Sequence, residues 1–245
     1  TNPPFGSSVR QTEQAYFHQY RLANKSADWL NPKSKAAQRP AQDTEILFIE
    51  QCHTYLRPGG YLAMVIPDGI LTNSSLQYVR DQIESLYRIV AVVSMPQTAF
   101  AATGAGVKSS VLFLRKHSAQ QTKSIEDLRQ SLQDSIKAKH GFTKKLAALE
   151  QSKKDTLKKK TGFSDAELGK RAALQLVHLR EQKPDEKFEI EDTPTYQAWK
   201  KEVNEHFTEE IDELKFAASS AYDLAIQENQ TGYDILMGIA EDIGY

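Results

Sequence analysis

Four residues near the start of the sequence, Asn2-Pro3-Pro4-Phe5, combine an amide, two prolines and an aromatic ring. Each proline fixes its own φ and favours extended geometry in the residue before it, so we expect Asn2 and Pro3 to be extended. Because Pro4 has no backbone N–H, a carbonyl of this stretch is left for a donor from outside. The Asn2 side-chain oxygen and the Pro3 carbonyl oxygen could then accept both N–H groups of a planar amine, such as that of adenine. This grip would pull the amine towards tetrahedral geometry and make its nitrogen a better nucleophile.

The ring of Phe5 adds a face on which an extruded base could stack. Stacking on an aromatic side chain is worth about 1–3 kcal/mol per base, which helps to offset the few kcal/mol that unstacking costs. Taken alone, the four residues fit an ordinary turn equally well. Asp68, which follows a predicted strand, is also open to two interpretations, a functional carboxylate or a turn residue. Cys52 has no histidine at a useful spacing, so we interpret it as a packing residue.

The composition of the chain narrows its class. It has 245 residues, of which 40% are hydrophobic and 26% charged, as in ordinary globular proteins. No apolar run reaches the roughly 20 residues of a membrane helix, so we expect no membrane partner. The single cysteine excludes an internal disulfide, and the six histidines lack metal-ligand spacing. We therefore expect a cytoplasmic protein without structural zinc, whose N-terminus is cut, since neither an initiator methionine nor a leader is present.

Hydrophobic patterns in the first half of the chain predict alternating helices and strands. Helices are expected over 42–55 and 74–87, and strands over 61–66, 88–94 and 109–114. Alternation of this kind predicts an α/β layer with a largely parallel sheet.

The pattern changes after Arg115, where apolar residues recur every three or four positions among many lysines. This predicts a long amphipathic helix over 125–157, broken at Gly141. A capping box at Ser164 and Glu167 predicts a second helix to residue 182, and a third begins at Thr193-Pro194. We predict three parts: 1–117 in a catalytic domain, 118–216 as a helical, coiled-coil-like insert, and 217–245 returning to the first domain.

Five stretches of the chain resemble the N6-adenine DNA methyltransferases, and most closely the modification subunits of type I restriction systems. They are TNPPFG, LRPGGYLAMVIPDGIL, YVRDQIES, RIVAVVSMPQTAFAATGAGVKSSVLFLRK and DILMGIAEDIGY, which cover nearly all of residues 1–117 and the last dozen. The resemblance implies that Asn2, Pro3, Pro4 and Phe5 hold the target adenine. It also implies S-adenosylmethionine as cofactor, and strands from the later part of a Rossmann-like methyltransferase sheet.

The resemblance also shows what is missing. In this family a glycine-rich cofactor loop and an acidic residue precede the Asn-Pro-Pro-aromatic motif, and neither occurs here, so we expect no cofactor-binding residue in this chain. We interpret Thr103-Gly104-Ala105-Gly106 as a turn, because a strand-like run follows it rather than a helix. The chain is expected to be the downstream part of a longer enzyme, inactive by itself.

Partners follow from the same resemblance: double-stranded DNA, a specificity subunit, a second modification subunit and a nuclease or translocase subunit. Lys108 is a candidate for contact with DNA. Lys144 and Lys145 in the insert are a second candidate, although a solvated helix face is the commoner meaning of such lysines.

Two other functions stay open at this level. Asn-Pro-Pro-aromatic motifs also occur in enzymes that methylate glutamine side chains of proteins or guanine amines of RNA. A non-enzymatic chain, in which the helical region from about 116 to 218 serves as an assembly arm, is the third hypothesis.

Overall fold

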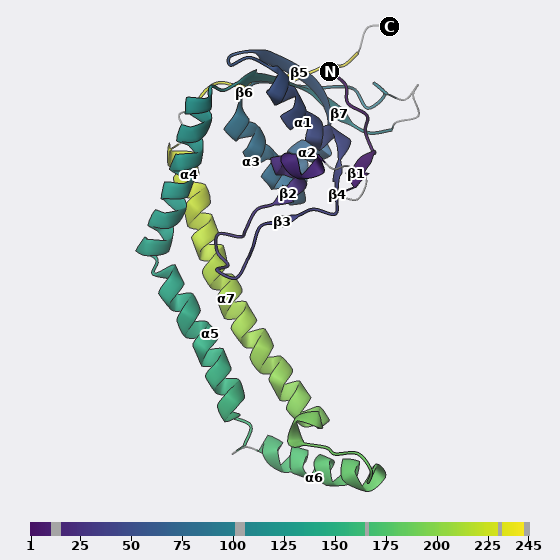
Figure 1. The fold of residues 1–245 in the computed structure, drawn as a ribbon, viewed down its shortest axis with the longest axis vertical. Helices are drawn as coiled ribbons and strands as arrows, with labels where there is room; N and C mark the ends of the chain where they lie inside the picture. The colour runs from purple at the N-terminus through teal and green to yellow at the C-terminus, as the bar shows by residue number, and fades with distance from the viewer. Residues whose placement is uncertain (11–15, 101–105, 165–166, 230–231, 243–245) are drawn as a thin grey trace. The chain divides into compact units, whose positions relative to one another are not determined.

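A computed structural model describes residues 1–10, 16–100, 106–164, 167–229 and 232–242 of the chain (Figure 1). It contains two compact units: Thr1–Gln130 together with Gln230–Tyr245, and Ser131–Asn229. We placed the insert at 118–216, but the last helix continues unbroken through residue 216 to Asn229. The sequence around residue 216 contains no glycine or proline that would end a helix there.

A four-stranded mixed sheet forms the centre of the first unit, in the order β5-β7-β6-β8. The strands are β5 (Tyr61–Pro67), β6 (Tyr87–Ser94), β7 (Ser109–Lys116) and β8 (Leu236–Ile239). β7 runs antiparallel to both β5 and β6, whereas β8 runs parallel to β6. The α/β class predicted from the sequence is confirmed, but the expectation of a largely parallel sheet is wrong for β7. Parallel neighbours need a crossover, usually a helix, and the described residues between β6 and β7 contain none.

Helices cover one face of this sheet (Figure 1). They are α1 (Thr44–Tyr55), the single turn α2 (Gly69–Thr72) and α3 (Gln77–Leu86), which the 3₁₀ turn η3 (Ser74–Leu76) precedes. Alternate residues of β5 point towards them, so that Leu62, Met64 and Ile66 are buried while Tyr61 and Ala63 are exposed. Ile49 of α1 and Ile83 of α3 complete this core, in which burial of apolar side chains stabilises the unit.

Short elements connect the chain start to α1, and none of them was predicted. β1 (Ser8–Arg10) pairs with β4 (Ala41–Asp43), and β2 (Asn24–Lys25) pairs with β3 (Ala37–Gln38), both antiparallel. Two 3₁₀ turns, η1 (Phe17–Gln19) and η2 (Arg21–Ala23), lie between β1 and β2.

The second unit is helical. It holds the end of α4 (Ala119–Lys139), then α5 (Phe142–Lys159), α6 (Glu167–Gln182), the turn η5 (Ile190–Asp192) and α7 (Pro194–Asn229). The predicted break falls where expected, because Gly141 has φ +58° between α4 and α5. The predicted helical insert is confirmed, whereas the capping box before α6 spans residues 165–166, outside the described residues.

Aromatic packing holds the second unit together. Phe163, Ala172, Tyr196 and Trp199 form one buried cluster, with ring centroids 5.2–5.3 Å apart among the three aromatic residues. α5 also packs beside α7 (Figure 1). Among the described residues, no helix is long and apolar enough to span a membrane.

Candidate functional site

The Asn2–Phe5 segment begins beside the free edge of β5. The Thr1 nitrogen donates to the Ala63 carbonyl at 2.6 Å, and the Val65 N–H donates to the Thr1 carbonyl at 3.0 Å. This pattern is typical of parallel neighbours, so the chain leaves Thr1 in the direction in which β5 runs. Asn2 and the residues after it therefore follow the carboxyl end of β5, the end at which open α/β sheets place their ligands.

Two acceptors of this segment have no hydrogen-bond partner in the described part of the chain. The Asn2 side chain is exposed, and neither its amide nor the carbonyl of the buried Pro3 takes part in a hydrogen bond there. The exposed Pro4 adds no N–H. The arrangement that the sequence predicts, two acceptors on consecutive residues free for an outside donor, is consistent with this geometry; the role of these residues stays a prediction.

The ring of Phe5 is half-buried and contacts a second aromatic residue, Phe100. Their centroids lie 6.1 Å apart with the ring planes at 86°, an edge-to-face pair. Gly6 follows with φ +71°, a left-handed conformation that turns the chain towards β1. Sequence reasoning did not single out Phe100, because a ring contact across 95 residues leaves no local signal.

The connection from β6 to β7 is attached to the carboxyl end of β5. The Asp68 N–H donates to the Lys108 carbonyl at 3.0 Å, and the Ser110 hydroxyl donates to Asp68 Oδ1 at 2.7 Å. The Asp68 carbonyl accepts from the N–H groups of Leu71 and Thr72 in α2. Asp68 is thus a turn residue whose carboxylate is engaged by Ser110, a partner that the sequence analysis missed.

The predicted DNA-contacting lysines belong to different units of the structure. The Lys108 ammonium donates to the Met95 carbonyl and braces the β6–β7 connection. Lys144 and Lys145 are exposed on α5, in the other unit. Thr103, Gly104 and Ala105 of the predicted turn lie outside the described residues.

Cys52 and His53 are half-buried near the end of α1. Cys52 packs against the sheet core, and burial raises the pKa of its thiol, so it is a poor nucleophile at neutral pH. For the His53 imidazole burial has the opposite sign, because it disfavours the protonated ring: the pKa is lowered to about 4, and the positive charge of Lys116 adds to the effect. The His53 ring makes an edge-to-face contact with Tyr87. Neither supplies an acid or base near Asn2; the packing interpretation of Cys52 is confirmed.

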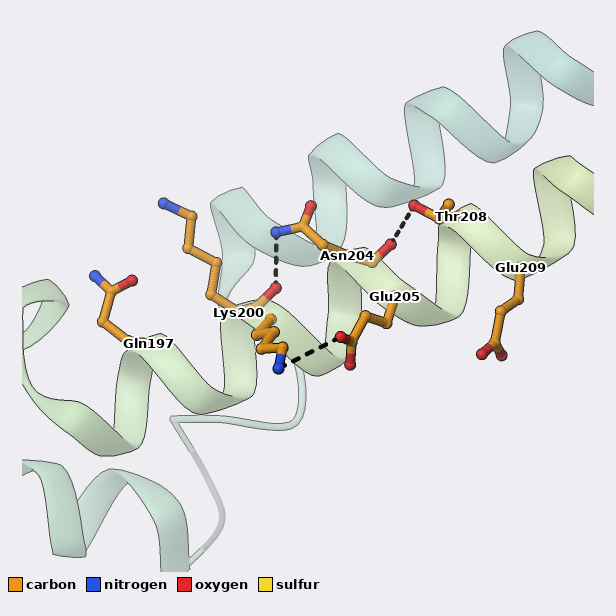
Figure 2. Close-up of a pocket in the computed structure, with 7 residues that line it drawn as sticks. Gln197, Lys200, Asn204, Glu205, Thr208 and Glu209 are labelled. Carbon is orange, nitrogen blue, oxygen red and sulfur yellow. Dashed lines mark hydrogen bonds and ion pairs between the residues drawn. The ribbon is translucent and has the colours of Figure 1, made fainter.

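A shallow groove of about 520 Å³ lies along α7 in the second unit (Figure 2). Its polar side chains are used within the helix: Asn204 donates to the Lys200 carbonyl at 2.8 Å, Thr208 donates to the Asn204 carbonyl at 2.7 Å, and Lys201 pairs with Glu205 at 3.6 Å. These are ordinary contacts of a solvated helix face, and they converge on no common point.

Comparison with known proteins identifies the family. The N-6 DNA Methylase family matches residues 1–183, which is well over half of the chain. The chain belongs to the N-6 DNA methylase family. Its Asn-Pro-Pro-Phe segment, strands β5, β6 and β7 and the helical unit as far as α6 lie within the matched residues, whereas β8 lies outside them. Curated proteins provide no match to this N-6 DNA methylase.

Three solved structures are similar to parts of it. A protein assigned to the class I S-adenosylmethionine-dependent methyltransferases, from Listeria monocytogenes, is 23% identical over 48% of this chain and 31% of its own, with a TM-score of 0.36. A chain from a structure of the type I R-M system is 24% identical over 47% of this chain and 20% of its own, with a TM-score of 0.35. A modification subunit assigned to a type I restriction enzyme of Vibrio vulnificus YJ016 is 21% identical over 47% and 22%, with a TM-score of 0.35. The N-6 DNA methylase chain thus spans less than a third of each of these structures.

S-adenosylmethionine is the cofactor that the family implies, and the polar groups near Asn2 bear on whether it could bind there. The free acceptors of Asn2 and Pro3 fit an amine that is to be methylated. One carboxylate oxygen of Asp68, the residue that follows β5, accepts a hydrogen bond from Ser110. The absence of cofactor-binding residues from this chain stays a prediction.

Proposed function

We propose that this chain supplies the adenine-binding half of a DNA methyltransferase that modifies N6 of a flipped adenine. The observation that carries the proposal is the pair of free acceptors, the exposed Asn2 amide and the Pro3 carbonyl, beside the carboxyl end of β5. Membership of the N-6 DNA methylase family supports it. S-adenosylmethionine would supply the methyl group.

The chain's own residues have three tasks in this proposal. The Asn2 side-chain oxygen and the Pro3 carbonyl each accept one N–H of the exocyclic amine, so the nitrogen lone pair is freed from the ring and aimed away from both acceptors. Pro4 keeps the Pro3 carbonyl extended without adding a competing donor. Phe5 stacks on the flipped base. Because the amine nitrogen gains positive charge as it is methylated, both acceptors interact more strongly with the transition state than with the substrate.

The same proposal assigns partners. We infer that the protein acts in the cytoplasm on double-stranded DNA as the modification subunit of a type I restriction system, with a specificity subunit, a second modification subunit and a nuclease or translocase subunit. The α5 and α7 pair offers long exposed helix faces for assembly, and the resemblance of the motifs to modification subunits supports this assignment.

The test is transfer of labelled methyl groups from S-adenosylmethionine to unmethylated DNA. The protein encoded by the complete reading frame is assayed with and without its neighbouring specificity subunit, and the modified base is identified by mass spectrometry. Formation of N6-methyladenine supports the proposal. If the label enters protein glutamine or RNA guanine instead, or if S-adenosylmethionine is bound but no substrate is methylated, the proposal is refuted.

A further inference from the structure

A polar cavity of about 740 Å³ in the first unit lies between the β2–β3 hairpin and α3. Its polar lining includes Arg21, Lys25, Arg39, Ser75, Tyr78 and Gln82. Three of the lining side chains are basic and none is a carboxylate. An excess of positive charge around a hollow attracts an anion.

Arg39 is held in one orientation before any ligand arrives. Its guanidinium carbon lies 3.9 Å from the centre of the Tyr78 ring. The Tyr78 hydroxyl accepts from Gln42 Nε2 at 2.8 Å, and the same nitrogen donates to the Leu22 carbonyl at 2.6 Å. The Arg39 backbone N–H donates to the Ala23 carbonyl at 2.9 Å. A guanidinium fixed in this way loses little freedom when it binds a planar pair of oxygens.

Two donors of this cavity are buried without an acceptor in the described structure. Arg39 Nε and Gln82 Nε2 are both inaccessible to solvent, and neither makes a hydrogen bond. Buried polar atoms nearly always have a partner, and each of these donors would gain one if its side chain turned towards an acceptor in the cavity. Lys25 adds an exposed ammonium that has no carboxylate partner in the described part of the chain, whereas Arg21 is paired with Glu126 at 2.5 Å.

Charge outside the cavity indicates a polyanion rather than a small anion. Residues 21–39 contain five basic side chains and one acidic side chain, Asp28. Three of the five, Arg21, Lys25 and Arg39, line the cavity, and Lys35 is exposed outside it on the same segment. A polymer of phosphates could contact the exposed lysines while one of its phosphates enters the cavity, whereas a single small anion would use the cavity alone.

We propose that the cavity formed by Arg39, Gln82 and Lys25 binds a phosphate group of the DNA backbone. The proposal rests on the proposed function, since it assumes that DNA is the substrate. The oxygens of a tetrahedral phosphate point in different directions, so separate oxygens could accept from the Arg39 guanidinium, the Gln82 amide and the Lys25 ammonium. Such a contact positions the duplex and reads no base.

The test compares three variants of the complete protein, each of which lowers the net charge by one. Gln82→Glu places a carboxylate in the cavity, and Arg39→Gln removes the guanidinium. Lys123→Ala is the matched control, because Lys123 is an exposed lysine on α4 of the same unit that neither lines the cavity nor belongs to residues 21–39. Binding to a fluorescent duplex is measured by anisotropy between 0.05 and 0.5 M salt, with about 0.1 M as reference. Loss of one phosphate contact should lower the slope of log K against log salt by about 0.9, which corresponds to about eightfold weaker binding at 0.1 M salt.

We expect this loss for Gln82→Glu and Arg39→Gln on every DNA sequence tested, and a smaller change for Lys123→Ala. Gln82→Glu is the decisive variant, because its carboxylate offers Arg39 a partner and should raise or preserve the melting temperature while DNA binding falls. Unchanged affinity and salt slope in a folded Gln82→Glu protein would overturn the proposal. A second experiment measures the melting temperatures of the wild type and of Gln82→Glu with and without inorganic phosphate. If phosphate raises the melting temperature of the wild type only, and Gln82→Glu binds DNA as the wild type does, the site is one for free phosphate and the DNA assignment is wrong. The proposed function fails separately, through absence of N6-methyladenine in the wild type.

Discussion

Replacing Phe5 tests the stacking role, because the structure separates what the ring does for the fold from what it would do for a base. In the described structure the Phe5 ring is half-buried and makes an edge-to-face contact with Phe100. An aromatic pair of this kind is worth about 0.5–1.5 kcal/mol, so Phe5→Ala should lower the free energy of unfolding by an amount of that order. Base stacking is worth about 1–3 kcal/mol, and its loss should lower kcat/KM for DNA by about 5- to 150-fold.

The assay is methyl transfer to a duplex at subsaturating DNA, with the free energy of unfolding measured in parallel by denaturant titration. Phe5→Trp should retain activity, because an indole offers a larger stacking face. Phe216→Ala is the matched control: this ring is 74% exposed on α7, and its loss should leave kcat/KM within about twofold. Wild-type kcat/KM in a folded Phe5→Ala protein would show that no base stacks on this ring.

Variants at four further positions test other parts of the structure. Asn2→Ala should lower kcat about 100-fold or more through loss of one acceptor, with the melting temperature and S-adenosylmethionine binding unchanged because the side chain is exposed; turnover at the wild-type rate would remove Asn2 from the mechanism. Tyr87→Phe should cost about 1–2 kcal/mol in urea titrations, since the buried hydroxyl donates to the Ile49 carbonyl at 2.8 Å; no change would mean that this bond adds nothing. His53 has a pKa of about 4 in the folded chain and 6.5 in the unfolded chain, so the unfolded state binds more protons between these pH values, and the stability present above pH 6.5 is lost as the pH falls towards 4. His53→Gln should flatten the dependence of the free energy of unfolding on pH over this range, and an unaltered dependence would contradict the lowered pKa of His53. Gly141→Ala should cost about 1–2 kcal/mol at φ +58° and Gly141→Asn less, as thermal melts would show; equal melting temperatures for all three proteins would argue against a left-handed residue there.

The sequence predicts the elements whose hydrophobic period is regular. Helices α1, α3 and α5–α7 and strands β5–β7 are found close to the expected residues, because each buries one stripe or one alternating face. The two-stranded pairs β1–β4 and β2–β3 were missed, since segments of two or three residues have no period to detect. The reversed direction of β7 was missed for another reason, because a strand's hydrophobic pattern is the same in either direction.

Part of the candidate site could likewise be predicted from the sequence and part could not. Asn2-Pro3-Pro4-Phe5 is visible in the sequence because proline restricts the backbone locally, and the structure leaves its two acceptors without partners in the described part. The Phe5–Phe100 contact and the Ser110–Asp68 hydrogen bond join residues far apart in the chain, and only the folded sheet brings them together. The stacking of Arg39 on Tyr78 is equally non-local.

The pairing of β6 with β8 has a consequence for synthesis of the chain. Its two strands are separated by roughly 140 residues, including the whole helical unit. At about 5–20 residues per second, translation needs on the order of 7–30 s to deliver β8 after β6 has emerged. During this interval the edge of β6 is open on the nascent chain, a template for pairing with a neighbouring chain on the same polysome. Variants that slow translation of the helical unit should therefore aggregate more during expression without being less stable once folded.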